Sequence, residues 1–302
     1  MNSYSLLIGL INSGLLAGTP LLLAAIGEIC AERSGVLNLG IEGMMLFAAM
    51  TGFWAALVTG SAGVGLVAGV LAGTALSAIH AVGVISCKGD PIVSGLALGF
   101  FGAGLSSVLG SSLVGRSAPS LPDLYFPILA EIPVIGKVLF SWNAVVPLAI
   151  IFAVITWALL ERTRFGLHAL AAGQAPEAAT KLGISVSAQR YVCTLFGGAM
   201  AGMAGASLSL AVTPGWVDNI TAGQGWITIG LVVFSRLKPW RGAVGAFLFG
   251  ALRRAVIDLQ GVPSLPFFRN PNLGYFLAMI PYLATIAVLM AEGLAQRKRA
   301  GR

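Results

Sequence analysis

Charged side chains are scarce in this chain. Of its 302 residues, 10% are Asp, Glu, Lys or Arg, whereas soluble domains carry about a quarter. Hydrophobic residues make up 57%, and the mean hydropathy is +0.90. This apolar excess is too large for one soluble core, so much of it must face lipid. The composition therefore excludes a soluble protein and predicts an integral membrane protein in a lipid bilayer.

Residues that support chemistry are equally few. Cys30, Cys87 and Cys193 lie far apart and have neither disulfide nor metal-site spacing. We see no Ser/His/Asp arrangement and no pair of carboxylates, so we expect no enzyme activity, metal or cofactor in this chain. The phosphate-binding motif GxxxxGK(S/T) is absent, because Gly136-Lys137 is followed by valine. If ATP and Mg²⁺ drive the protein, a partner subunit must bind them.

Long uncharged runs separate the charges that remain. A helix needs roughly 20 apolar residues to cross the hydrocarbon layer, and most of these runs reach that length. We expect an all-α membrane bundle of about nine or ten transmembrane helices, forming one domain over residues 1–302. The expected helices are 5–27, 42–60, 63–86, 91–113, 139–160, 190–212, 222–235, 241–260 and 273–292.

Many of the 40 glycines lie four residues apart within these runs. This spacing places small residues on one face of a helix and lets neighbouring backbones approach closely. The pattern predicts tight packing between helices, with sliding of close helices past one another as a further interpretation. The sets are Gly14/Gly18, Gly65/Gly69/Gly73, Gly95/Gly99 and Gly198/Gly202.

The basic residues predict the orientation in the membrane. Loop 161–190, loop 236–241 and the tail 293–302 are rich in Lys and Arg, so we place all three in the cytoplasm. Loop 114–138 then lies outside, and its four prolines suit an irregular segment. The orientation of the N-terminus stays open, because segment 28–42 could be a re-entrant stretch rather than a full connection. Since the positive charges follow the loops, the net charge of +7 does not indicate nucleic-acid binding.

Loop 161–190 contains signals for a short helix. Pro176 suits the first turn of a helix and Gly183 suits its end. Glu177 and Lys181 lie one turn apart, with the acidic residue near the positive end of the helix. The sequence therefore predicts a short helix that projects into the cytoplasm between two spans, and an ordinary loop helix would show the same signals.

At this point the sequence resembles a known family. The pattern Glu177-Ala178-Ala179-x-x-x-Gly183 resembles the EAA loop of ABC importer permeases, in which a coupling helix docks on the ATPase. The stretches 32–45 and 90–98 are similar to those of nucleoside-type permeases, and the likeness covers most of residues 14–292. The branch is the one that handles simple sugars, nucleosides and branched-chain amino acids. The sequence departs from the family pattern at Arg253-Arg254.

The resemblance implies a type II importer-like permease of the bacterial inner membrane, with a cytoplasmic C-terminus. Its partners would be two ABC ATPase subunits, a second permease subunit and an extracellular or periplasmic solute-binding protein. The solute would be a nucleoside, with simple sugars second. The residues expected to couple the chain to the ATPase are Gly173, Pro176, Glu177, Ala178, Ala179 and Gly183.

Polar residues within apolar surroundings are candidates for the translocation path. They are Asn38, Glu42, Ser94, Arg253 and Arg254. Non-helical backbone at membrane depth is tolerated where it is buried in protein or lines a water-filled path, which favours the segment around Asn38. The alternative for segment 28–42 is a plain cytoplasmic turn with solvated charges.

The arginines have an alternative interpretation too, in which they extend toward the outer interface and Arg254 pairs with Asp258. We expect Asp90 to cap a helix and His80 to be buried and hydrogen-bonded.

The rival function is an ion-coupled secondary transporter of small polar solutes, which would need intramembrane ion ligands. Glu42, His80 and Asp258 are the available residues. A structural or channel-like membrane protein is a further alternative.

Overall fold

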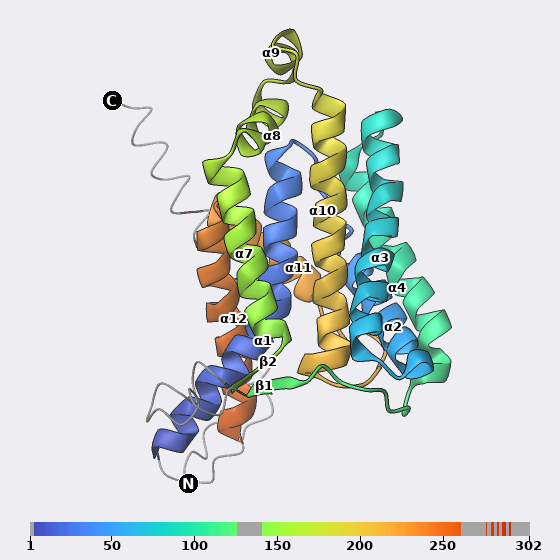
Figure 1. The fold of residues 1–302 in the computed structure, drawn as a ribbon, viewed down its shortest axis with the longest axis vertical. Helices are drawn as coiled ribbons and strands as arrows, with labels where there is room; N and C mark the ends of the chain where they lie inside the picture. Colours follow the sequence, from blue (N-terminus) through green and yellow to red (C-terminus); the bar gives the residue numbers. More distant parts are fainter. Residues whose placement is uncertain are drawn as a thin grey trace.

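The computed structural model describes residues 3–125 and 141–260, with a few single positions between 276 and 290. Within that part the chain is a bundle of helices (Figure 1). The helices are α1 (Ser3–Arg33), α2 (Ile41–Thr59), α3 (Ala62–Ala81), α4 (Pro91–Gly110), α7 (Val145–Arg162), α8 (Arg164–Gln174), α9 (Pro176–Lys181), α10 (Val186–Ser207), α11 (Gln224–Ser235) and α12 (Pro239–Gln260). A π-helical turn extends α3 (η1, Val82–Ser86) and another extends α10 (η3, Leu208–Val212), while a 3₁₀ turn extends α4 (η2, Ser111–Leu113).

The first helix lies among α7, α10, α11 and α12, and α2 and α3 pack together on the other side of α10 (Figure 1). Short helices α8 and α9 lie at one end of the bundle, and strands β1 (Asp123–Tyr125) and β2 (Ser141–Asn143) lie at the opposite end. The strands pair antiparallel, with Leu124 opposite Trp142. This two-stranded sheet is a small addition to the all-α architecture expected from the sequence.

Six helices of the described residues are long and apolar enough to cross a membrane. They are α1 from Ile11, α2, α3 with η1, α4 with η2, α7, and α10 with η3. The 12-residue α11 is apolar but shorter than a full span. The expectation of a multi-pass helical membrane protein is confirmed, while the span expected at 273–292 and the tail 293–302 fall outside the described part.

Two expected boundaries were wrong. We expected the first span to end at residue 27, but α1 continues to Arg33, so the non-helical connection is residues 34–40. The acidic residue Glu28 lies inside this helix, where its side-chain Oε1 accepts a hydrogen bond from the Asn38 N–H. The fifth span begins at Val145 and not at 139, because residues 141–143 form β2.

Glycine faces bring the helices into close contact, as their spacing predicted. A Cβ added to Gly73 of α3 would lie 2.4 Å from the Gly198 carbonyl oxygen of α10. One added to Gly202 would lie equally close, at 2.4 Å, to the Gly69 carbonyl oxygen. In the pairing of α1 with α12, a Cβ on Gly18 would lie 2.9 Å from the Phe247 Cα. Any side chain at these positions would force the helices apart.

A matched pair of glycines on α4 tests this packing. A Cβ at Gly102 would lie 2.4 Å from the Gly43 carbonyl oxygen of α2, whereas one at Gly104 would meet nothing within 4 Å. We expect Gly102→Ala to lower the free energy of unfolding by about 1–3 kcal/mol through overpacking. Gly104→Ala should leave it unchanged or raise it by about 0.5–1 kcal/mol, because alanine favours helix. Thermal unfolding of the purified chain in detergent measures both, and equal stability of the two variants would contradict the close contact of α2 with α4.

Candidate functional site

A buried polar segment lies between α1 and α2. Glu28, Asn38 and Glu42 are 2%, 1% and 8% exposed, although all three belong to a stretch that could have been a solvated turn. The solvated-turn alternative is therefore wrong, because these polar groups are buried inside the bundle. Burying a polar group without a hydrogen bond costs free energy, so the hydrogen-bond partners of each group show which parts of the chain the segment connects.

Glu42 binds the beginning of α11. Its carboxylate accepts hydrogen bonds from the Thr221 hydroxyl at 2.5 Å, the Gly223 N–H at 3.0 Å and the Gly225 N–H at 2.6 Å. The first N–H groups of a helix lack partners within the helix and carry partial positive charge, so a carboxylate there is favourable. Gly225 permits the approach, since an added Cβ would lie 2.5 Å from the Glu42 Cα. Glu42 thus connects two elements that are far apart in sequence.

Asn38 holds the turn that leads into α2. Its backbone N–H donates to Glu28 Oε1 at 2.9 Å, and its side-chain Oδ1 accepts from the Gly40 N–H at 2.9 Å. Gly95 of α4 packs directly on this turn, where an added Cβ would lie 2.6 Å from the Leu39 nitrogen. The backbone of the segment is therefore satisfied by side chains rather than by helix or sheet.

His80 and Ser94 complete this polar cluster. The His80 ring lies 3.0 Å from the Ser94 hydroxyl through Nδ1 and 3.2 Å from the Leu37 carbonyl oxygen through Nε2. The imidazole is fully buried, which confirms the expected buried and hydrogen-bonded histidine. Asp90 also caps α4 as expected, accepting from the Ile92 and Val93 N–H groups at 2.9 Å each. Ser94 thus lies beside the segment that contains Asn38.

The two arginines proposed for the path lie elsewhere. Arg253 and Arg254 are half-buried on α12, next to Ala251, which packs on Gly14 of α1. Gly14 is 14 residues from Glu28, or about 21 Å along the helix at 1.5 Å per residue. The structure therefore does not bring the arginines together with Asn38, Glu42 and Ser94. The side chain of Asp258, their expected partner, lies outside the described residues.

The loop helices form a second candidate site. The short helix α9 begins at Pro176, and Gly183 follows it with a φ of +79°, so both expected boundary residues are confirmed. The sequence reasoning missed α8, which precedes it. Ala178 is exposed and Leu182 is 80% exposed, so this side of α9 is open to a partner.

Two of the expected coupling residues face their own chain. Ala179 is 1% exposed and packs toward α8 and α10, so its methyl group does not lie on the open side of α9. Gly173 packs on the end of α1, where an added Cβ would lie 2.4 Å from the Arg33 carbonyl oxygen. Both residues hold the loop helices in place, and Ala178 and Leu182 form the surface that is open to a partner.

Arg190, which the sequence reasoning did not select, fastens the loop helices to the buried segment. From α10, its Nε donates to the Ser34 carbonyl and its Nη2 to the Ala172 carbonyl, each at 3.2 Å. A guanidinium at the carboxyl ends of two helices satisfies carbonyls that lack partners within the helix. The sequence reasoning missed Arg190, and also Thr221 and Gln224, because none of these residues belongs to a local sequence motif. The amide oxygen of Gln224 is buried next to the Glu42 site without a hydrogen-bond partner in the described part.

Comparisons with known proteins find relatives over nearly the whole chain. A family model described as "Branched-chain amino acid transport system / permease component" matches residues 10–288. A protein of Haloferax volcanii, provisionally named a glucose ABC transporter permease protein, is 40% identical over 93% of this chain and 90% of its own length. The guanosine ABC transporter permease protein of Bacillus subtilis is 32% identical over 96% of this chain and 93% of its own. The nucleoside ABC transporter permease protein of Lactococcus lactis is 31% identical over the same shares, 96% and 93%.

The Glu42 contacts generate a stability prediction. Glu42→Gln replaces an acceptor oxygen with an NH₂ group that faces backbone N–H donors, so a buried donor loses its partner. We expect a loss of about 1–3 kcal/mol in the free energy of unfolding. Thr221→Val, which removes one donor only, should cost less. The control is Glu177→Gln on the exposed side of α9, which should have the same unfolding temperature as the parent. If Glu42→Gln also unfolds at the parent's temperature, Glu42 does not cap α11.

Proposed function

Because the chain belongs to the family of permease components of branched-chain amino acid transport systems, we propose that it is the membrane-spanning permease subunit of an ATP-binding cassette importer. The family match over residues 10–288 is the observation that carries this proposal. Partner ATPases bind ATP and Mg²⁺, a second permease subunit completes the membrane part, and an external solute-binding protein delivers the solute. The complex would lie in the plasma membrane with the chain's C-terminus inside.

The solute class follows from the relatives. Two of those described above are named for guanosine or nucleosides and one for glucose, so we propose nucleosides first and simple sugars second. Both classes carry several hydroxyl groups, which need hydrogen-bonding partners along an otherwise apolar protein. The buried amide oxygen of Gln224, near Glu42, and the half-buried Ser94 support a polar path on this side of the bundle. Arg253 and Arg254 would belong to a different part of the path.

The ion-coupled alternative has less support. Glu42 already accepts three hydrogen bonds from the protein, and both ring nitrogens of His80 lie at hydrogen-bonding distance from protein oxygens. Glu42 and His80 would have to give up these hydrogen bonds to bind an ion.

The proposed mechanism is alternating access driven from the α8–α9 unit. Leu182 is 80% exposed at the end of α9, where an ATPase groove can bury it. ATP binding can switch the path only if the ATPase binds one permease conformation more tightly than the other. The contacts of Gly173 and Arg190 with the end of α1 give the docked unit a direct contact with the bundle.

The orientation is tested by thiol labelling in intact cells. In a variant without its own cysteines, Ser120→Cys should react with a membrane-impermeant thiol reagent, because residue 120 would lie outside. Thr180→Cys on α9 should react only after the membrane is opened, and both positions are exposed in the fold. Labelling with the opposite sidedness would overturn the assignment from the basic loops.

The docking surface is tested with Leu182→Glu and Ala178→Glu. Each variant adds a charge to the exposed side of α9, where a docked partner would have to bury it without a counter-charge. We expect both variants to insert normally, to retain less ATPase on co-purification, and to lose nucleoside-stimulated ATP hydrolysis in the complex with its binding protein. Simple sugars are compared in the same assay.

The matched control is Val114→Glu, an exposed apolar position (55%) at the opposite end of the bundle. It should co-purify like the parent. If Leu182→Glu and Ala178→Glu also keep the full amount of ATPase, α9 is not the coupling helix.

A further inference from the structure

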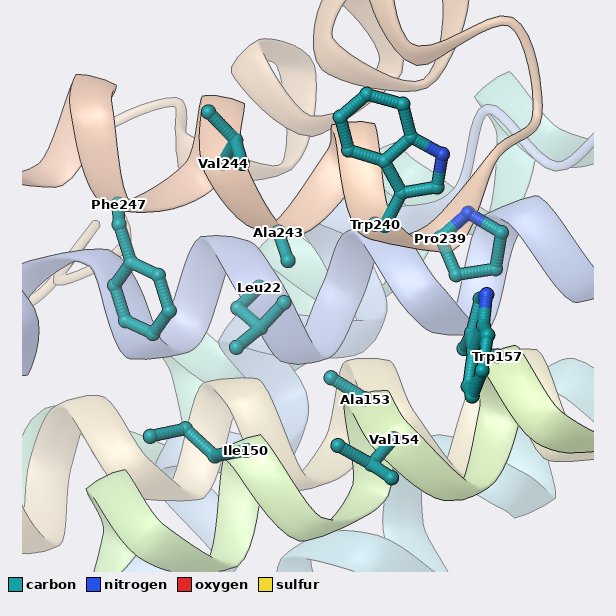
Figure 2. A pocket seen from close by; sticks show the side chains of 10 residues that line it. All are labelled: Leu22, Ile150, Ala153, Val154, Trp157, Pro239, Trp240, Ala243, Val244 and Phe247. Carbon is teal, nitrogen blue, oxygen red and sulfur yellow. The ribbon is translucent and has the colours of Figure 1, made fainter.

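An apolar groove on the surface of the described part of the chain is not used by the proposed transport mechanism. It lies between α1, α7 and α12, has a volume of about 300 Å³, and is lined by hydrophobic side chains (Figure 2). Trp157 and Trp240 stand at one end of the groove, and Ile150 and Phe247 at the other, with Leu22 of α1 between them. We call this site the tryptophan groove. Its walls offer almost no polar atom, so a nucleoside or a sugar is not its ligand.

The dimensions of the tryptophan groove suit a lipid chain. Trp157 and Ile150 are seven residues apart on α7, and Trp240 and Phe247 are seven apart on α12, which is about 10 Å along each helix. One leaflet of a bilayer contributes about 15 Å of hydrocarbon. The groove therefore accommodates the first two thirds of an acyl chain that runs parallel to the helices.

Two arginines mark the tryptophan end. The guanidinium of Arg162 lies 5.1 Å from the Trp157 ring centroid, and that of Arg241 lies 5.3 Å from the Trp240 ring centroid. Both distances are within the range of cation–π attraction, which holds the two positive charges next to the groove. An acidic residue, Glu161, lies nearby and accepts the Trp157 indole N–H at 3.0 Å. Two cations thus stand where the headgroup of a lipid in the groove would lie.

We propose that the tryptophan groove binds an anionic phospholipid, with one acyl chain along α7 and α12 and its phosphate between Arg162 and Arg241. A basic pocket between membrane helices at one interface is the chemistry that recognises an anionic headgroup. The indole rings suit the same level, because tryptophan prefers the boundary between hydrocarbon and headgroups. The lipid would lie in the cytoplasmic leaflet if the proposed function and its orientation hold. The binding itself does not depend on that orientation.

Lipid retention measures the proposal directly. The purified full chain is placed in phosphatidylcholine nanodiscs that contain a minor fraction of phosphatidylglycerol, and lipid that stays bound after transfer to detergent is quantified by mass spectrometry. The parent should retain phosphatidylglycerol in preference to phosphatidylcholine. We expect Arg162→Gln and Arg241→Gln each to reduce this preference about fivefold, the effect of one basic residue at a membrane surface.

Three further variants separate the site from a general charge effect. Lys88→Gln removes an exposed basic residue from another loop and should leave the preference unchanged. The charge-keeping double variant Arg162→Lys and Arg241→Lys should retain most of it. Ala243→Phe, which fills the groove without touching a charge, should reduce retention of the lipid.

The proposal is overturned if the parent shows no preference for phosphatidylglycerol, or if Lys88→Gln lowers it as much as the groove arginines do. It is also overturned if Ala243→Phe retains lipid like the parent, because the lipid then binds outside the groove. These readouts need neither ATPase nor solute, so a failure here is distinct from a failure of the transport function.

Discussion

Inside a membrane protein, backbone that is not helical has no water to bind, so every buried N–H and C=O must find a protein partner. The segment between α1 and α2 meets this constraint with side chains. Glu28 accepts the Asn38 N–H, Asn38 accepts the Gly40 N–H, and Arg190 donates to the Ser34 carbonyl. The positions of α2, α10 and α11 then depend on one another, because each supplies or receives part of this network. Buried polar side chains are tolerated in so apolar a chain because they supply hydrogen bonds that helices cannot supply here.

Glycine makes the network possible. Glu42 reaches the N–H groups of α11 because Gly225 has no side chain, and the turn at Leu39 meets α4 because Gly95 has none. Without a strong hydrophobic force between helices in lipid, contact area gained by close approach is the main source of helix association. The same residues thus serve packing and hydrogen bonding, so a substitution at either position would disturb both.

Local chemistry decided what the sequence could predict. The spans follow from long apolar runs, and the bounds of α9 follow from Pro176 and Gly183, since each acts through its own backbone. The Asp90 cap was predictable for the same reason. The contact of Glu42 with Thr221 and Gly223 was not, because it joins residues about 180 positions apart and carries no local motif. The burial of Ala179 also escaped prediction, because a six-residue helix with two adjacent alanines does not show which of them packs inward.

The contacts around the end of α1 constrain any motion that begins at α9. Gly173 touches the backbone of Arg33, and Arg190 binds carbonyls of both Ser34 and Ala172, so α8 cannot shift without disturbing the carboxyl end of α1. That end leads directly into the turn at Asn38, and the turn leads into Glu42 and α11. Coupling between distant sites requires an element with two arrangements that both sites bias. Segment 34–40 is non-helical and is held by side-chain hydrogen bonds, so a displacement of the α1 end would have to pass through these contacts to reach Glu42.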